Sequence, residues 1–155
     1  MLHLFQCQYL RPFWEQCITF CKDVLKTTEP DNHLAAHIFG EWSRGKLGPV
    51  PARALLRHAF NHLYRHFCYV ELKDYQFKWQ KAYYDTLRAF KDACLRYARK
   101  LQLLHIRRRY TTQTDTAPRA AYLKYEPFLH IERPEGTPSL SNEFTAAIED
   151  ARKEA

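Results

Sequence analysis

Apolar residues recur at helical spacing along two long stretches of the chain. In the first stretch, residues 52–72, one stripe follows a spacing of four, three, four and three positions and consists of Leu56, Phe60, Leu63, Phe67 and Val70. In the second, residues 74–109, a stripe lies within about 40° of one line at about 100° per residue, and it consists of Trp79, Tyr83, Thr86, Phe90, Ala93, Tyr97, Leu101 and Leu104. The pattern therefore predicts two long amphipathic helices, over 52–72 and 74–109.

The connection between these two helices decides the architecture. No glycine or proline separates the stripes, so they form either a hairpin that turns near residues 71–74 or one very long bent helix. The hairpin is favoured, because a second helix of about 35 residues alone would measure about 50 Å. Two such stripes can bury each other as a coiled-coil-like pair.

Two shorter helices are predicted before this pair. The first covers residues 12–27, where Pro12 suits a first helical turn and apolar positions recur at helical spacing: Phe13, Cys17, Phe20, Cys21, Val24 and Leu25. The second covers residues 31–42, with Asp31 or Asn32 as its cap and a glycine-rich segment at its end. Because strand-like alternation is almost absent, we predict an all-α protein, a helical hairpin or small bundle in a domain of residues 1–110.

The composition changes after Tyr110. Residues 111–120, TTQTDTAPRA, lack apolar periodicity and are interpreted as a linker. Residues 121–134 have extended character and aromatic side chains available to fold back onto the helices. The final stretch, SNEFTAAIEDARKEA, has a capping serine or asparagine and predicts a weak terminal helix. Residues 111–155 are thus expected to form a linker and a weakly structured acidic tail.

Charge is distributed unevenly along the chain. The net charge is +7, but residues 126–155 contain seven acidic and three basic residues, a balance of −4, so the preceding part carries +11. Such an excess favours polyanions, because neutralised phosphates release counterions. The densest basic segment contains six basic residues and no acid, and consists of Arg96, Arg99, Lys100, Arg107, Arg108 and Arg109, with Tyr110 next to it.

We expect this segment to bind RNA or DNA, mostly through phosphates. Tyr84 or Tyr110 is available to stack on an unpaired base. Two alternatives remain open, a helix C-terminus that carries favourable positive charge and a contact with a protein partner.

Three histidines raise the question of a metal site. His58, His62 and His66 recur at four-residue spacing, and two histidines at this spacing can bind one transition metal. However, His58 lies about 200° from Phe60 around a helix, away from the apolar stripe. Together with the neighbouring Arg57 and Arg65, the series is interpreted as a solvated face or a polyanion-binding surface.

Signatures of catalysis are missing from the sequence. There is no glycine-rich phosphate loop, no HExxH and no G-x-S-x-G. Asp85 and Asp92 are one heptad apart, but basic residues stand at helical ion-pair spacing from both, so a surface charge ladder is favoured over a catalytic carboxylate pair. We therefore expect a protein that is not an enzyme.

The sequence also bears on the compartment. No run of 18 apolar residues and no secretory signal pattern occurs, so no membrane span is expected. The odd number of cysteines, without disulfide-like spacing, favours reduced thiols in an intracellular protein, nuclear or cytoplasmic; they are Cys7, Cys17, Cys21, Cys68 and Cys94.

The opening segment HLFQCQYLRPFW, residues 3–14, resembles a known family. It is similar to the closing half of the zinc-binding segment that follows the reverse transcriptase in non-LTR retroelement polyproteins. In that family a CxxC pair precedes HLFxC, and an aromatic FW pair then opens a helix. Here His3 and Cys7 match the second ligand pair, and Phe13-Trp14 matches the aromatic opening. The resemblance implies a helical, basic C-terminal region of a reverse transcriptase polyprotein, without the polymerase aspartates.

The zinc chemistry of that segment is not expected here. The CxxC half does not precede His3 in this sequence, so His3 and Cys7 form an incomplete half site. Completing it would require Cys17, Cys21 or a distant histidine. We therefore predict no bound cofactor and a non-enzymatic nucleic-acid-binding helical domain. The alternative is a helical protein–protein interaction module that forms a homo-oligomer through its aromatic stripes and does not bind nucleic acid.

Overall fold

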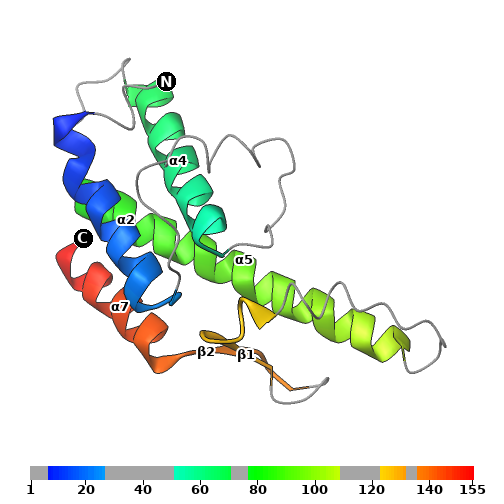
Figure 1. Ribbon diagram of the computed structural model, residues 1–155. Helices are drawn as coiled ribbons and strands as arrows, with labels where there is room; N and C mark the ends of the chain where they lie inside the picture. Colours follow the sequence, from blue (N-terminus) through cyan, green and yellow to red (C-terminus); the bar gives the residue numbers. More distant parts are fainter. Residues whose placement is uncertain (1–6, 27–50, 71–76, 109–122, 132–135) are drawn as a thin grey trace.

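A computed structural model shows a mostly helical protein built around one long helix (Figure 1). It describes residues 7–26, 51–70, 77–108, 123–131 and 136–155, with the side chains of 53, 67–70 and 104–108 left aside. The elements are η1 (Gln8–Leu10), α2 (Arg11–Asp23), α4 (Pro51–Val70), α5 (Trp79–Arg108), β1 (Leu129–His130), β2 (Ser139–Leu140) and α7 (Asn142–Glu154). The predicted high helix content is confirmed.

The all-α prediction needs one correction, because a small antiparallel sheet is present. Leu129 pairs with Leu140, and His130 pairs with Ser139. The backbone of Ser141 also donates to the carbonyl of Phe128 at 2.8 Å. The strands form because the buried Phe128 and Leu129 bring their backbone into a region where its polar groups need partners.

The N-terminal helix follows its predicted stripe. Pro12 lies in the first turn of α2, and all six predicted apolar positions of residues 12–27 are buried. The helix itself ends at Asp23, and Lys26 adopts a positive φ of 56° as the chain turns away. The predicted helix over 31–42 lies outside the described residues.

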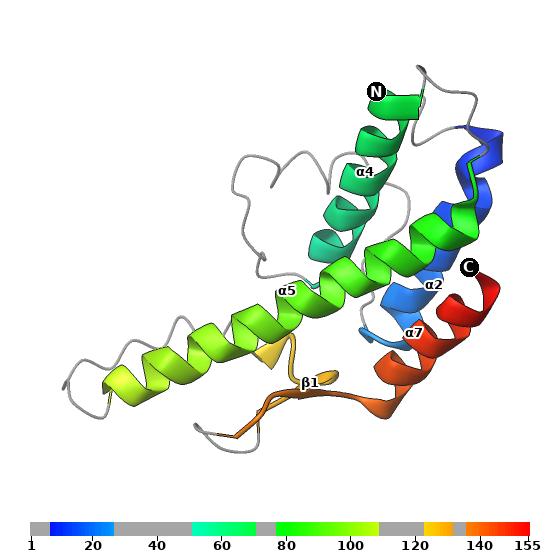
Figure 2. The same cartoon turned by 180° about the vertical axis from the view of Figure 1, so that it is seen from behind.

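The two long helices are separate elements, and α5 begins at Trp79, so residues 77 and 78 lie outside the helix that was predicted to include them. α4 and α5 pack past each other in opposite directions (Figure 2): the ring of His58 lies 6.2 Å from that of Phe90, whereas His66, two turns later, lies 4.8 Å from Phe77. The predicted turn near residues 71–74 lies outside the described residues.

The buried face of α5 is broader than the predicted stripe. Thr86 and Phe90 are fully buried, whereas Tyr83 and Tyr97 are only half-buried. The deepest positions continue instead along Leu87, Cys94, Ala98 and Gln102. The buried face of α5 is wider than the predicted stripe because α5 contacts α2, α7 and β1 as well as α4. It is therefore not one half of a two-helix pair.

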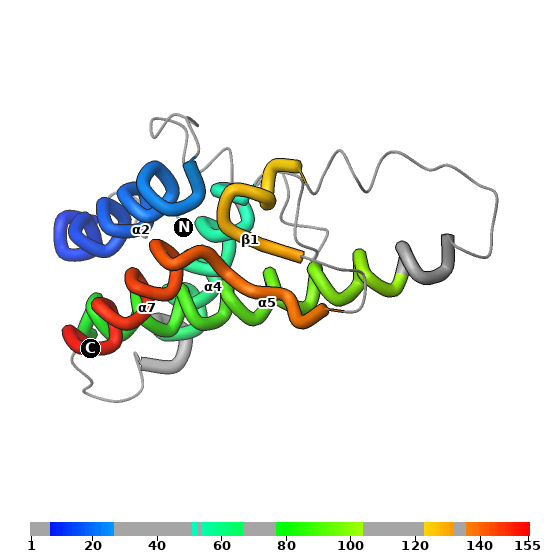
Figure 3. The backbone as a smooth tube through the Cα atoms, turned by 90° about the horizontal axis from the view of Figure 1, so that it is seen from below, coloured from blue at the N-terminus to red at the C-terminus, as the bar shows by residue number. Residues whose placement is uncertain are grey.

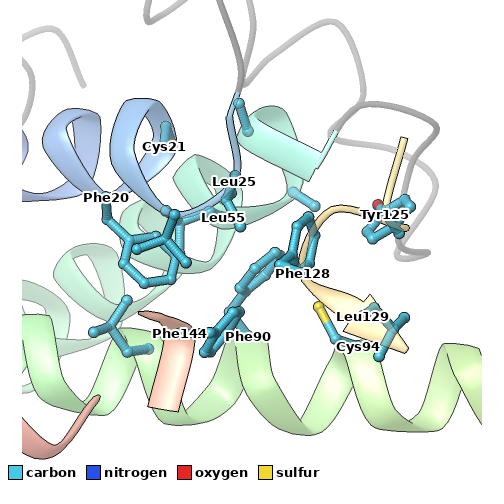
Figure 4. Close-up of a cluster of buried hydrophobic side chains, with 14 of the residues drawn as sticks. Phe20, Cys21, Leu25, Leu55, Phe90, Cys94, Tyr125, Phe128, Leu129 and Phe144 are labelled. Atoms are coloured by element: carbon cyan, nitrogen blue, oxygen red, sulfur yellow. The ribbon is translucent and has the colours of Figure 1, made fainter. Parts of the chain in front are cut away.

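The C-terminal segment corrects the expectation of a weakly structured tail. Phe144 is fully buried; its ring stacks on Phe90 at 6.0 Å and meets the ring of Phe20 edge-on at 5.1 Å (Figure 4). Tyr125 and Phe128 are also fully buried in this core cluster. Residues beyond 110 therefore complete the core of the helical domain. The predicted linker over 111–120 lies outside the described residues.

A side-chain cap and an ion pair stabilise the start of helix α7. The side chain of Ser141 accepts a hydrogen bond from the backbone of Phe144 at 3.2 Å, so Ser141 is the predicted cap. Lys26 forms an ion pair with Glu143 at 3.0 Å. Viewed from below, α7 runs alongside the first half of α5, and the second half of α5 continues beyond it (Figure 3).

We predict that Phe144→Ala lowers the free energy of unfolding by about 3–5 kcal/mol, because it removes a fully buried ring and leaves a cavity between three segments. Urea denaturation followed by circular dichroism measures this change. The control is Asn142→Ala, which alters an exposed residue of the same helix and should change the free energy by less than about 0.5 kcal/mol. Equal stability of the two variants would contradict the assignment of Phe144 to the core.

Candidate nucleic-acid interface

Three predicted phosphate-binding residues lie together on the second half of α5. Arg96, Arg99 and Lys100 are all exposed, and at about 100° per residue they fall within an arc of about 100°. We call this set the basic face of α5. None of its three members forms an ion pair with another of the described residues. Within the described part of the chain, no acidic side chain neutralises these three charges.

The structure describes the other predicted nucleic-acid-binding residues only in part. Arg107 and Arg108 belong to the last turn of α5, and their side chains are outside the description. Arg109 and Tyr110 lie outside the described residues. The basic face as defined thus covers half of the six basic residues that the sequence indicated.

The acidic C-terminal helix does not cover the basic face. Phe144, near the start of α7, packs on Phe90, and Glu154, at its end, acts electrostatically on Tyr83. Helix α7 therefore runs back toward the start of α5, away from Arg96. Asp92 is the last acidic residue of α5 itself, so the helix beyond it carries positive charge alone.

The basic face is held from behind by the segment around the small sheet. Tyr97 packs against the ring of the buried Tyr125 at 5.0 Å, and the buried side chain of Gln102 donates a hydrogen bond to the carbonyl of Gly136. Ala98 is fully buried on the same side. Sequence reasoning missed Gln102, because a polar residue on a helix carries no signal that its partner is a distant backbone carbonyl.

Tyr84 is not positioned beside the basic face. Its ring lies under the guanidinium of Arg88, 5.5 Å from the ring centroid, and it is half-buried on the first half of α5. Twelve residues separate it from Arg96, which is about 18 Å along a helix. Of the two predicted stacking residues, Tyr84 is therefore remote, and Tyr110 lies outside the described residues.

The histidine series lies on a different face from the one predicted. The ring of His58 contacts Phe90 of α5, and His62 is close to Asp85 of the same helix. The ring of His66 contacts Phe77, which lies just before α5. The three histidines therefore line the seam between α4 and the chain from Phe77 into the first half of α5. The reason is that α4 has two neighbours, and its apolar stripe packs with η1 and α2 as well as with the start of α5. The interpretation of the series as a solvated face is wrong for His58, which packs against the buried Phe90, and all three histidines are half-buried. The alternative of a polyanion-binding surface stays a prediction.

The seam disfavours protonated histidine. Burial lowers the pKa of His58 to about 4, and the positive charges of Arg57, His62 and Arg96 act in the same direction. Burial also lowers the pKa of His62, although Asp85 opposes this change, and burial followed by Lys81 lowers the pKa of His66.

The thiols proposed to complete a zinc site are part of the core. Cys17 and Cys21 are buried, and burial raises the pKa of the Cys17 thiol well above its ordinary range, with Cys21 adding to the effect. Cys7 is half-buried against the cluster that contains Cys17, and His3 lies outside the described residues. Within the described ranges, no three histidine, cysteine or acidic side chains form a group able to hold a metal ion. The pairing of His3 with Cys7 stays a prediction.

Comparisons with known proteins add no relatives: no protein-family model, no curated protein and no solved structure matches this chain. The resemblance of residues 3–14 to retroelement polyproteins therefore stays a prediction from those residues. None of the helices described has the length and apolar composition needed to cross a bilayer.

Acidification should destabilise the fold through His58. Its pKa is about 4 in the folded chain, against about 6.5 in an unfolded one, so between these values the unfolded state binds more protons. Its contribution is fully present above about pH 6.5 and is lost progressively toward pH 4, by up to about 3 kcal/mol.

Urea denaturation across this pH range provides the measurement. The variant His58→Gln cannot titrate and should lose less stability on acidification than the wild type. His130→Gln, at an exposed histidine of β1, is the control and should keep the wild-type pH dependence. An unchanged pH dependence in His58→Gln would contradict the placement of His58 in the seam.

Thiol reactivity should separate Cys7 from the core cysteines. We expect N-ethylmaleimide to modify Cys7 well before Cys17 and Cys94 in the folded chain, because burial raises the pKa of the latter two thiols and shields them. Peptide mass spectrometry over a time course gives the rate at each site, and denaturant should equalise the rates. Native-state modification of Cys17 as fast as Cys7 would show that Cys17 is open to solvent and available as a metal ligand.

Proposed function

We propose that this chain is a non-enzymatic, mostly helical domain that binds RNA or DNA through the basic face of α5. One observation carries the proposal: Arg96, Arg99 and Lys100 are exposed together on a helix segment without acidic residues, while the acidic helix α7 packs elsewhere.

The chemistry of this face suits phosphate groups. Arginine offers several N–H donors in a fixed plane and pairs with phosphate oxygens at two points, whereas lysine contributes a point charge. The contacts of Tyr97 and Gln102 with the segment behind α5 fix the helix before binding, so less conformational entropy is lost when the ligand arrives. We expect binding that depends strongly on salt and little on sequence.

The alternative function, self-association through aromatic stripes, has less support. The stripes predicted to pair between chains are largely used within one chain, since Phe60 and Leu63 of α4 are fully buried in a cluster with residues of η1 and α2. Tyr64, stacked on Phe60, is half exposed at the edge of this cluster. That alternative expects a concentration-dependent oligomer in sedimentation experiments without nucleic acid.

A place after the polymerase of a retroelement polyprotein fits the proposal. The resemblance of residues 3–14 implies such a region, and a domain there would hold nucleic acid without performing catalysis. An intracellular location, nuclear or cytoplasmic, is part of the same proposal.

The direct test replaces Arg96, Arg99 and Lys100 by glutamine together. Fluorescence anisotropy with a DNA duplex and a single-stranded RNA across a salt series should show weaker binding. On the duplex, the slope of log K against log salt should also become less steep by up to about 2.7, because each lost phosphate contact contributes about 0.9. Glutamine is a good helix former, so α5 should keep its structure.

The matched control removes the same number of charges elsewhere. Arg11 and Lys22 on α2 and Lys153 on α7 are all exposed, and replacing these three by glutamine should leave most of the slope intact. Equal slopes for the wild type and the basic-face variant, or equal losses in both variants, would contradict the proposed site.

A further inference from the structure

An exposed apolar residue lies beside the basic face of α5, and phosphate binding does not explain it. Leu103 is 60% exposed, and around the helix axis it lies within about 20° of Arg96 and about 40° of Arg99. Phosphates offer charge and hydrogen-bond acceptors, so a surface that only neutralises them gains nothing from an exposed leucine. A ligand that presents apolar atoms between its phosphates would use both features.

The shape of this part of the molecule limits which kind of ligand the second half of α5 can bind. The second half of α5 extends beyond β1 and β2 (Figures 1 and 2). Among the described residues, Tyr97 and Gln102 attach it to the segment around these strands. Arg96, Arg99 and Leu103 are exposed on the side of the helix that faces away from Tyr97 and Gln102. An α-helix with its side chains is about 10–12 Å wide, which matches the width of about 12 Å of the major groove of B-form DNA.

We infer that the ligand of the basic face is duplex DNA, with the second half of α5 in the major groove. Arg96, Arg99 and Lys100 contact the phosphates and groove edges, and Leu103 packs against the C5-methyl groups of thymines. This inference rests on the proposed function and narrows it. It gives the protein a preference for A·T-rich duplexes without requiring a defined site.

The other polyanions fit the same features less well. The major groove of duplex RNA is too deep and narrow to admit a helix, and uracil has no methyl group for Leu103. Single strands lack a groove. A membrane surface is disfavoured because interfacial helices carry a whole apolar face, whereas residues 96–103 present one exposed leucine among charges.

The experiment compares two A·T-rich DNA duplexes that differ only in the thymine methyl groups. One contains thymine and the other deoxyuridine at every such position, so charge and helix form are matched. The wild type should bind the thymine duplex about 4-fold more tightly, the change expected for burying one methyl group. It should also bind an RNA duplex of the same sequence more weakly than either.

Two variants assign this preference to one side chain. Leu103→Ala should bind both DNA duplexes with equal affinity, close to that of the wild type for the uridine duplex, and with an unchanged salt slope. Leu123→Ala removes another exposed leucine, 56% exposed and outside α5, and should keep the preference for thymine. Because both leucines are exposed, neither change should impair folding.

Each contrary outcome has a separate meaning. Salt-dependent binding with equal affinity for the thymine and uridine duplexes overturns the groove inference and leaves the proposed function standing. Binding to none of the nucleic acids at about 50 mM salt removes both. Leu103-dependent binding to vesicles of phosphatidylserine and phosphatidylcholine, without a thymine preference, overturns the inference in favour of a membrane surface.

Discussion

The packing of Phe144 against α5 is the contact on which the rest of the structure depends. Its ring lies 6.0 Å from Phe90, 5.1 Å from Phe20 and 5.9 Å from Phe128, so one side chain joins the N-terminal helix, the central helix and the segment before β1. Aromatic contacts of this kind add directional preference to the burial of apolar area. They fix where α7 lies, and with it where the four acidic residues of that helix lie.

That position separates the charges of the chain in space. Helix α7 runs from Phe90 toward Tyr83, and the second half of α5 is left to basic residues. The positive charge also reaches the neighbouring seam, where burial first, and then Arg57, His62 and Arg96, lower the pKa of His58. A fold that concentrates positive charge in this way is suited to a ligand that supplies the missing negative charge.

The sequence predicts the elements of this fold better than their arrangement. The stripe of α2 is correct at every position, because a helix end marked by Pro12 and a regular period leaves little freedom. A stripe shows that a helix has a partner but not which one, so the histidines of α4 were assigned to a solvated face or a polyanion-binding surface although they face α5 and the residues just before it. The role of Phe144 had no local signal, since one aromatic residue in an acidic segment does not reveal its neighbours. For the candidate site, the run of basic residues is visible in the sequence, whereas the support from Gln102 depends on a carbonyl 34 positions away.

The account is tested most directly by titrating the ¹⁵N-labelled chain with an A·T-rich DNA duplex and following backbone amide resonances. At 18.5 kDa the chain is well suited to this measurement. The account predicts shift changes concentrated from Arg96 to Leu103, with the resonances of α7 unchanged, because α7 stays docked on the first half of α5. Changes centred on α7, or spread evenly over the exposed lysines and arginines, would contradict it.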